Sequence, residues 1–247
     1  MIKHRVSCLS LSILLLTGQS VVAETRPVVV ELFTSQGCYS CPPADHLLGE
    51  LSAQPDIVAL EFHVDYWDGL VYGSAGKWKD PFSDAGYTRR QQSYNSQDLG
   101  GRIGVYTPQM IIGGNYAVVG SNRSAVLTRL EAIRSDESMQ LRVDATQDGK
   151  SLTVSVSGGD RHIDAGVWLV RLDRQHLTAV PNGENNGKTL TNHNVVRAMT
   201  RIGDWKGADM QMQIDDFQLG PNQHCAILVQ TTDPLGPIIG AARCPES

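Results

Sequence analysis

Several features that would assign a chain to a common functional class are missing from this sequence. Its 247 residues carry 21 Lys and Arg against 26 Asp and Glu, giving a formal net charge of −5 with no basic stripe. This balance argues against nucleic acid as a partner. There is no internal repeat, no low-complexity tract and no second long apolar run after the N-terminal one. No Ser-His-Asp triad, phosphate-binding loop or paired-CxxC zinc motif can be assigned either.

The first residues, 1–23, have the pattern of a secretory signal peptide. Lys3 and Arg5 precede an apolar stretch that is too short to span a bilayer comfortably, and small residues end at Ala23. We therefore expect a periplasmic or secreted protein that begins at Glu24 and has no integral membrane segment after cleavage. A retained N-terminal anchor is the alternative.

Cysteine is scarce but informatively placed. Of the five cysteines, Cys8 lies within the predicted signal peptide, which leaves four in the mature chain. An even number in an exported protein predicts oxidation in pairs. Cys225 and Cys244 flank a predicted C-terminal hairpin, and we expect them to form a structural disulfide. Cys38 and Cys41 form a CxxC pair.

The CxxC pair follows an apolar run at 28–33, typical of a strand, and opens a predicted helix at 42–51. Free amides at a helix start favour a thiolate on the first sulfur. Thiol–disulfide exchange is the chemistry that this arrangement supports: attack by one thiolate, a mixed disulfide, then resolution by the second thiol. A zinc site or a purely structural disulfide has the same spacing.

The hydrophobic pattern divides the chain into two predicted domains. Residues 24–136 read as a small α/β domain, with strands at 28–33, 56–64, 105–112 and 116–120 and helices at 42–51, 82–99 and 122–134. Residues 137–247 read as short strands separated by Gly/Asn/Pro-rich turns, which predicts an antiparallel β-sandwich-like domain. Its strand candidates are 141–145, 152–157, 166–172, 194–199, 211–214, 226–230 and 238–243.

Thr107-Pro108 stands inside an otherwise good strand, where proline is disfavoured unless the strand is an edge or the peptide bond is cis. With the CxxC helix and the order of elements, this dipeptide resembles the thioredoxin superfamily. Residues 106–114 resemble glutaredoxins in particular. Together with 30–38 and 63–68, the whole chain resembles a family of secreted bacterial proteins named only as a domain of unknown function with a thioredoxin-like fold.

That resemblance implies a fold class and a set of roles. It implies a thioredoxin-like N-terminal domain, with Cys38 as the exposed nucleophile and Cys41 as the buried resolving thiol. Pro108 would be cis and would leave the backbone of Thr107 free to hold an extended substrate. Glu31 would be a buried carboxylate that accepts the proton of the resolving cysteine, although a solvated or ion-paired strand glutamate is an alternative.

His63 lies with Glu61 and Asp65 on one face at the carboxyl end of a predicted strand. We interpret it as a proton shuttle beside the thiols or as a hydrogen-bonded structural histidine. The aromatic loop 66–78 forms either a lid over the site or a packing surface for the second domain.

The leading hypothesis is an exported thiol–disulfide oxidoreductase that needs no cofactor and acts on protein or small-molecule thiols. A copper-binding protein that uses Cys38, Cys41 and His63 is the first alternative. A catalytically inert binding module, in which the β-sandwich performs recognition, is the second.

Overall fold

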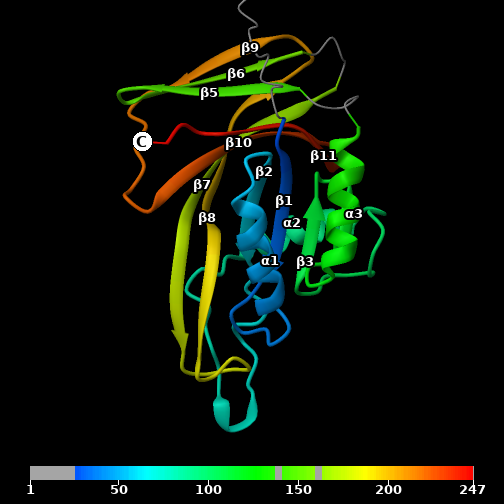
Figure 1. Cartoon of the computed structure of the whole chain (residues 1–247), viewed down its shortest axis with the longest axis vertical. Helices are drawn as coiled ribbons and strands as arrows, with labels where there is room; N and C mark the ends of the chain where they lie inside the picture. Colours follow the sequence, from blue (N-terminus) through cyan, green and yellow to red (C-terminus); the bar gives the residue numbers. More distant parts are fainter. Residues whose placement is uncertain (1–25, 137–140, 159–162, 247) are drawn as a thin grey trace, which may run out of the picture.

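The computed structural model describes residues 26–136, 141–158 and 163–246. The predicted signal peptide lies outside these residues. The first half contains, in chain order, β1 (Val28–Thr34), α1 (Pro42–Ser52), β2 (Ile57–His63), the 3-10 turn η1 (Gly73–Ala75), α2 (Ala85–Asn95), β3 (Gln109–Ile112), β4 (Tyr116–Val119) and α3 (Arg123–Arg134). This order of strands and helices confirms the predicted order (Figure 1).

The second half is built from strands. They are β5 (Arg142–Asp148), β6 (Ser151–Ser157), β7 (Ala165–Val180), β8 (Lys188–Trp205), β9 (Met210–Ile214), β10 (Gln223–Thr232) and β11 (Leu235–Arg243). β7 and β8 are much longer than their sequence patterns predicted, and they form the tall hairpin at the left of Figure 1.

The strands of both halves share one mixed sheet. Its order is β11-β10-β7-β8-β2-β1-β3-β4, while β5-β6-β9 form a second, smaller sheet. The junction between the halves is a parallel contact of β2 with β8, in which Glu61 pairs with Val195. β1 and β2 are also parallel, and β1 pairs antiparallel with β3.

This topology shows that the predicted fold class is wrong. The protein is not a thioredoxin-like domain followed by an all-β sandwich-like domain. Strands make up 44% and helices 17% of the described residues, and one eight-stranded sheet runs through both halves. The reason is the length of β8, whose 18 residues pair with β7 and also reach β2. Hydrophobic alternation reveals where a strand is, but not which distant strand it joins.

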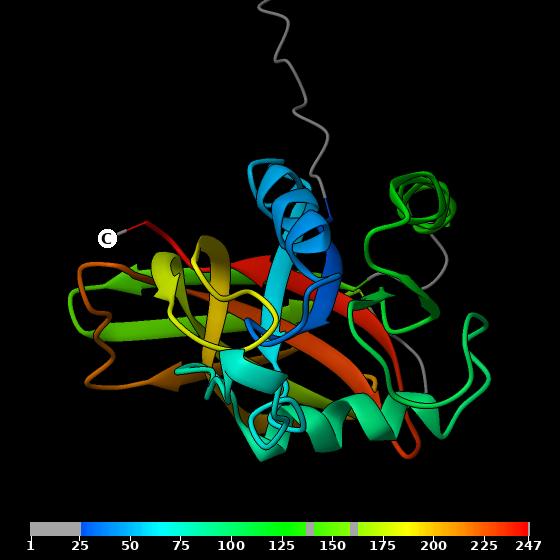
Figure 2. The same ribbon diagram turned by 90° about the horizontal axis from the view of Figure 1, so that it is seen from below.

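Helices cover both faces of the large sheet (Figure 2). α1 and α3 pack on one face and α2 on the other. Because side chains alternate along a strand, Val30 and Leu32 of β1 face α1, whereas Phe33 packs with Tyr94 of α2. The same alternation directs Thr34 toward α1.

The smaller sheet packs on the strands of the second half, and an apolar core fills the space between the two sheets. Cys225 and Cys244 lie in this core and form a disulfide, which confirms the predicted pairing. Within the described ranges, no helix has both the length and the apolar character needed to cross a membrane.

Candidate functional site

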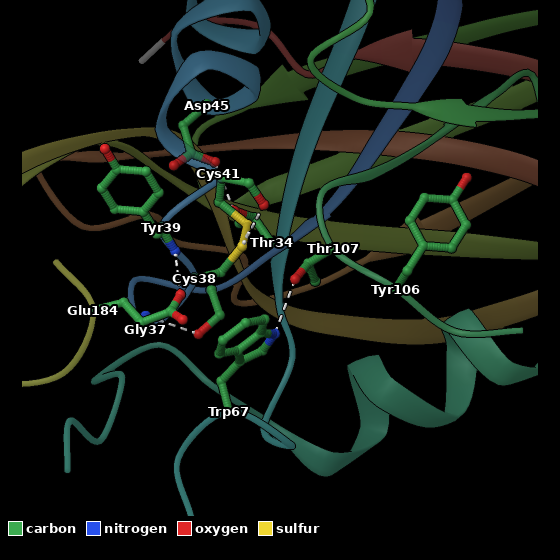
Figure 3. Close-up of a disulfide and its surroundings, with 12 residues drawn as sticks. Thr34, Gly37, Cys38, Tyr39, Cys41, Asp45, Trp67, Tyr106, Thr107 and Glu184 are labelled. Carbon is green, nitrogen blue, oxygen red and sulfur yellow. Dashed lines mark hydrogen bonds between the residues drawn. A yellow bond between two sulfur atoms is a disulfide. The ribbon is translucent and has the colours of Figure 1, made fainter. Parts of the chain in front are cut away.

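The CxxC motif lies at the start of α1, where Cys38 and Cys41 form a disulfide with a Cα–Cα distance of 5.4 Å (Figure 3). Cys41 is the N-cap residue, and Pro42 and Pro43 follow in the first turn. Proline is tolerated there because its missing N–H would have no intrahelical partner. The local sequence therefore fixes the motif at a helix N-terminus, as predicted.

The predicted exposure of Cys38 is wrong. Both cysteine side chains are 0% exposed. One cover is Trp67, which packs against Gly37 and donates a hydrogen bond of 2.9 Å from its indole Nε1 to the hydroxyl of Thr107. Figure 3 shows the indole ring beside the disulfide. The aromatic loop 66–78 thus covers the motif, which was one of its two predicted roles.

A second cover comes from the tip of the β7–β8 hairpin, residues 181–187. The buried amide of Asn185 donates 2.9 Å hydrogen bonds to the carbonyls of Gln36 and Cys38. The backbone N–H of Tyr39 donates to Glu184 at 2.8 Å. Sequence reasoning treated these residues only as a turn, because nothing in the local pattern links them to a motif nearly 150 positions away.

A buried carboxyl group lies one helical turn beyond Cys41. Asp45 is 3% exposed and accepts a hydrogen bond of 2.6 Å from the Thr34 hydroxyl. Burial, with a further contribution from Glu61, raises the pKa of Asp45 well above its usual range, against the opposing effect of the Thr34 hydrogen bond. Figure 3 shows this carboxyl beside Cys41. The i,i+4 spacing from Cys41 was the available sequence signal, and it was missed.

Glu31 does not occupy the position predicted for it. Strand alternation directs its side chain to the α2 face of the sheet, whereas the motif helix α1 covers the other face. There Glu31 accepts hydrogen bonds from Arg90 at 2.7 Å and from Tyr94 at 2.5 Å. The alternative prediction, an ion-paired strand glutamate, describes it correctly, and Asp45 occupies the place beside the resolving cysteine.

His63 lies on the α1 face, fully buried between two carboxylates. Its Nδ1 is 2.7 Å from Asp80, and its Nε2 is 3.5 Å from Glu61. Burial alone would lower the pKa of His63, but Asp80 and Glu61 outweigh it and raise the pKa to about 10. The imidazole is therefore protonated at neutral pH. It reaches the motif indirectly, because Asp80 accepts a 2.7 Å hydrogen bond from the backbone N–H of Gln36.

Gln36 is also the end of a polar chain from β8. Its amide donates to Asn192 at 2.8 Å, and Asn192 donates to Glu61 at 2.7 Å. The Gln36 side-chain oxygen is buried without a hydrogen-bond partner in the described part of the chain. The segment before Cys38 is thus held by hydrogen bonds of Gln36 to a buried polar network that joins β2 to β8.

Pro108 lies next to the first turn of α1, as predicted. The Thr107–Pro108 peptide bond is cis. A Cβ placed on Gly120 would come within 3.3 Å of the Pro108 Cβ and 3.2 Å of the Ala44 Cβ, so a residue without a side chain is needed where these two segments meet.

The copper-binding alternative gains no support from this geometry. Among the described residues, no group of three or more His, Cys, Asp or Glu side chains is placed to hold a metal ion. Nδ1 of His63 is bonded to Asp80, and Nε2 is buried 3.5 Å from Glu61 without a hydrogen-bond partner among the described residues.

These features define a protein with one large mixed sheet and a covered CxxC disulfide at a helix N-terminus. The chain belongs to the family described as "Protein of unknown function (DUF1223)", whose model matches residues 29–230. The predicted resemblance to a family of unknown function is therefore confirmed, whereas the thioredoxin-superfamily assignment gains no support.

The chain is also similar to a structural-genomics protein of Agrobacterium tumefaciens known from an X-ray crystal structure. The two are 31% identical with a TM-score of 0.75, and the match covers 91% of this chain and 97% of that one. Among curated proteins, nothing matches. The two disulfides fit an extracellular protein.

Proposed function

We propose that the protein is a thiol–disulfide oxidoreductase whose Cys38–Cys41 disulfide exchanges with substrate thiols once its cover opens. The observation that carries the proposal is the buried carboxyl of Asp45, one turn beyond Cys41 on the same helix, whose pKa is raised by burial. An inert disulfide needs no proton donor, and burying an ionisable group carries a free-energy cost. A carboxyl of raised pKa beside a leaving thiolate is what disulfide exchange uses.

In the direction that oxidises a substrate dithiol, the steps balance as follows. A substrate thiolate attacks the Cys38 sulfur, a mixed disulfide forms, and the Cys38–Cys41 bond breaks with its electron pair on Cys41. Asp45 gives its proton to this thiolate. The second substrate thiol then attacks the substrate sulfur of the mixed disulfide, the bond to Cys38 breaks with its electron pair on Cys38, and the proton of that second thiol passes to the Cys38 thiolate. The substrate leaves as a disulfide, and the protein holds two thiols after Asp45 regains a proton from the solvent.

Exchange requires Cys38 to become accessible, and the two covers suit this requirement. They are surface loops held to the motif by a few hydrogen bonds, and the N–H of Gly183 also donates to the carbonyl of Ala75 at 2.9 Å. Such segments open at a lower free energy than a core does. Tyr39, between the two cysteines, is 65% exposed and offers a first contact for a protein or small-molecule thiol.

The site of action that fits this chemistry is outside the cytoplasm. Disulfides persist in oxidising compartments, and residues 1–23 have the pattern of an export signal. We place the protein in the periplasm or among secreted proteins.

The test is glutathione exchange. The reduced protein is mixed with glutathione disulfide, and the release of glutathione is followed for wild type and for Cys38→Ser. We expect release by wild type, none by Cys38→Ser, and a stable mixed disulfide on Cys38 in Cys41→Ser, detected by mass spectrometry. Equal rates in wild type and Cys38→Ser would reject the proposal in favour of the inert binding module.

A further inference from the structure

A cavity of about 520 Å³ lies on the α2 face of the sheet and does not include the disulfide. This volume is within the range of roughly 300–1,000 Å³ that is typical of small-molecule sites. α2 forms one wall, and β7, β8 and the start of β11 form the other. The apolar part of the lining consists of Phe62, Trp168, Met199 and Leu235.

The charges around this cavity, which we call the α2 cavity, are mostly positive. Arg89, Arg90 and Arg197 line it against one carboxylate, Asp84. The excess belongs to the lining alone, because Glu31 and Asp173, the ion-pair partners of Arg90 and Arg197, are not part of it. Gly86, in the first turn of α2, is also part of the lining, which adds the positive end of the helix dipole.

Arg90 is held in a fixed orientation by hydrogen bonds from two of its three guanidinium nitrogens. Its Nε donates to Glu31 at 2.7 Å, and its Nη2 donates to Tyr94 at 3.0 Å and to Gln230 at 2.7 Å. Its side chain is 10% exposed, and its Nη1 has no hydrogen-bond partner among the described residues. A rigid, nearly buried guanidinium therefore keeps free donors at the wall of the cavity.

Arg89 and Arg197 complete the cationic side. Arg89 forms no ion pair within the part of the chain that the structure describes. Arg197 pairs with Asp173 at 3.5 Å, and its guanidinium carbon lies 5.3 Å from the centroid of the Phe82 ring. Asp84 opposes them, but its carboxylate already accepts a hydrogen bond from the Gly86 N–H as the N-cap of α2.

We propose that the α2 cavity binds a small organic carboxylate with an apolar body. The carboxylate would accept hydrogen bonds from Nη1 of Arg90 and charge stabilisation from Arg89 and Arg197, because guanidinium groups match carboxylate geometry. The apolar body would lie against Trp168 and Met199. A neutral apolar molecule would leave the Arg90 donors unsatisfied, and a purely polar anion would leave the apolar wall uncovered.

Isothermal titration calorimetry with decanoate tests the site, with decan-1-ol as the uncharged control. We expect saturable one-site binding of decanoate and at least tenfold weaker binding of the alcohol. Arg90 is left unchanged because its pairing with Glu31 supports the fold. Arg89→Gln should weaken decanoate binding roughly three- to fivefold, as expected for an exposed charge. The matched control Arg129→Gln, on α3 and across the sheet, should not change it.

Asp84→Asn should change the affinity for decanoate in the opposite direction. Asparagine keeps the N-cap hydrogen bond and removes the one negative charge of the lining, so decanoate should bind roughly two- to fourfold more tightly. A variant that only loosened the structure would not strengthen binding. Equal binding of decanoate and decan-1-ol, no decanoate binding at millimolar concentration, or unchanged affinity in both Arg89→Gln and Asp84→Asn would overturn the proposal.

Discussion

Cys225 and Cys244 join the start of β10 to the residue after β11, inside an apolar core between two sheets. Cys38 and Cys41 are equally hidden, but their cover is made of loops and their supporting groups are polar. The Cys225–Cys244 disulfide is surrounded by apolar core side chains, as expected for a structural disulfide. The Cys38–Cys41 disulfide has the buried carboxyl of Asp45 beside it, with a raised pKa, and a hydrogen-bonded cover above it.

Under the proposed function, burial alone does not separate a structural disulfide from a reactive one. The two disulfides would differ in whether a proton can be delivered to the leaving sulfur and whether the cover can open without breaking a core. Changes to the cysteines, to the buried charges near the motif and to the cover break or sharpen this comparison.

The largest effect is expected from the cysteines themselves. Cys38→Ser should abolish glutathione exchange and leave stability little changed, because the loop closed by Cys38 and Cys41 is short. The double variant Cys225→Ser, Cys244→Ser should retain exchange and lose about 2–4 kcal/mol of unfolding free energy. Exchange rates and urea denaturation measure the two effects. The comparison fails if the double variant loses exchange while still folded.

His63→Gln should cost about 3–5 kcal/mol, because it leaves Glu61 and Asp80 as buried charges without their cation. The pKa of His63 in the folded protein is about 10, against an ordinary value of 6.5. Its stabilising contribution is therefore complete below pH 6.5 and is lost as the pH rises through 10.

Urea denaturation of wild type at several pH values should show unfolding free energy falling across this interval. His63→Gln should lack that fall. An equal pH slope in both proteins would show that His63 is not the charged partner in the folded state.

Asp45→Asn removes the proposed proton donor but should leave the fold intact. Exchange should slow roughly a hundredfold, which is within the usual range for loss of a general acid. Asparagine can still accept the Thr34 hydrogen bond, so the packing is kept. Thr128→Val, at an exposed position of α3, is a control that should leave the rate unchanged.

The same variant should be more stable than wild type at neutral pH. Because the pKa of Asp45 is raised above its ordinary value of 3.8, the folded protein holds a proton that the unfolded chain releases above that pH. Wild-type stability therefore falls as the pH rises from 3.8, and Asp45→Asn lacks this fall. A variant that is less stable at pH 7 than at pH 4, relative to wild type, would contradict the buried-acid assignment.

Asn185→Ala weakens the cover. It removes two hydrogen bonds to motif carbonyls, each worth about 1 kcal/mol net, so opening should become roughly thirtyfold more frequent. Dithiothreitol should reduce the Cys38–Cys41 disulfide faster by that factor, with no change for Cys225–Cys244. Glu184→Gln, which alters an exposed hydrogen bond, should give a smaller increase. No change in either variant would mean that the hairpin tip does not control access.

The sequence was most informative where structure is local. The apolar run at 28–33, the two prolines after Cys41 and the Asn122 cap of α3 each identify an element from a few neighbouring residues. α2 was predicted over 82–99 and spans Ala85–Asn95, because Asp84 caps it rather than Ser83.

The sequence could not predict which strands far apart in the chain lie side by side. The outer half of β7 alternates exposed residues such as Gln175 with half-buried ones such as His176, so its pattern is weak and the hairpin was predicted too short. Without that length, β8 could not be placed beside β2, nor Asn185 above Cys38. The buried carboxylate was assigned to Glu31 and Asp45 was overlooked for a similar reason: strand alternation places Glu31 on the face opposite α1, whereas Asp45 lies on α1 itself.

The most direct test is the midpoint potential of both disulfides in one protein, measured by equilibration in dithiothreitol redox buffers, alkylation and mass spectrometry. We predict that Cys38–Cys41 titrates above about −300 mV and Cys225–Cys244 below it. If both couples titrate together below about −300 mV, Cys38–Cys41 is a structural disulfide like Cys225–Cys244, and the oxidoreductase proposal is contradicted.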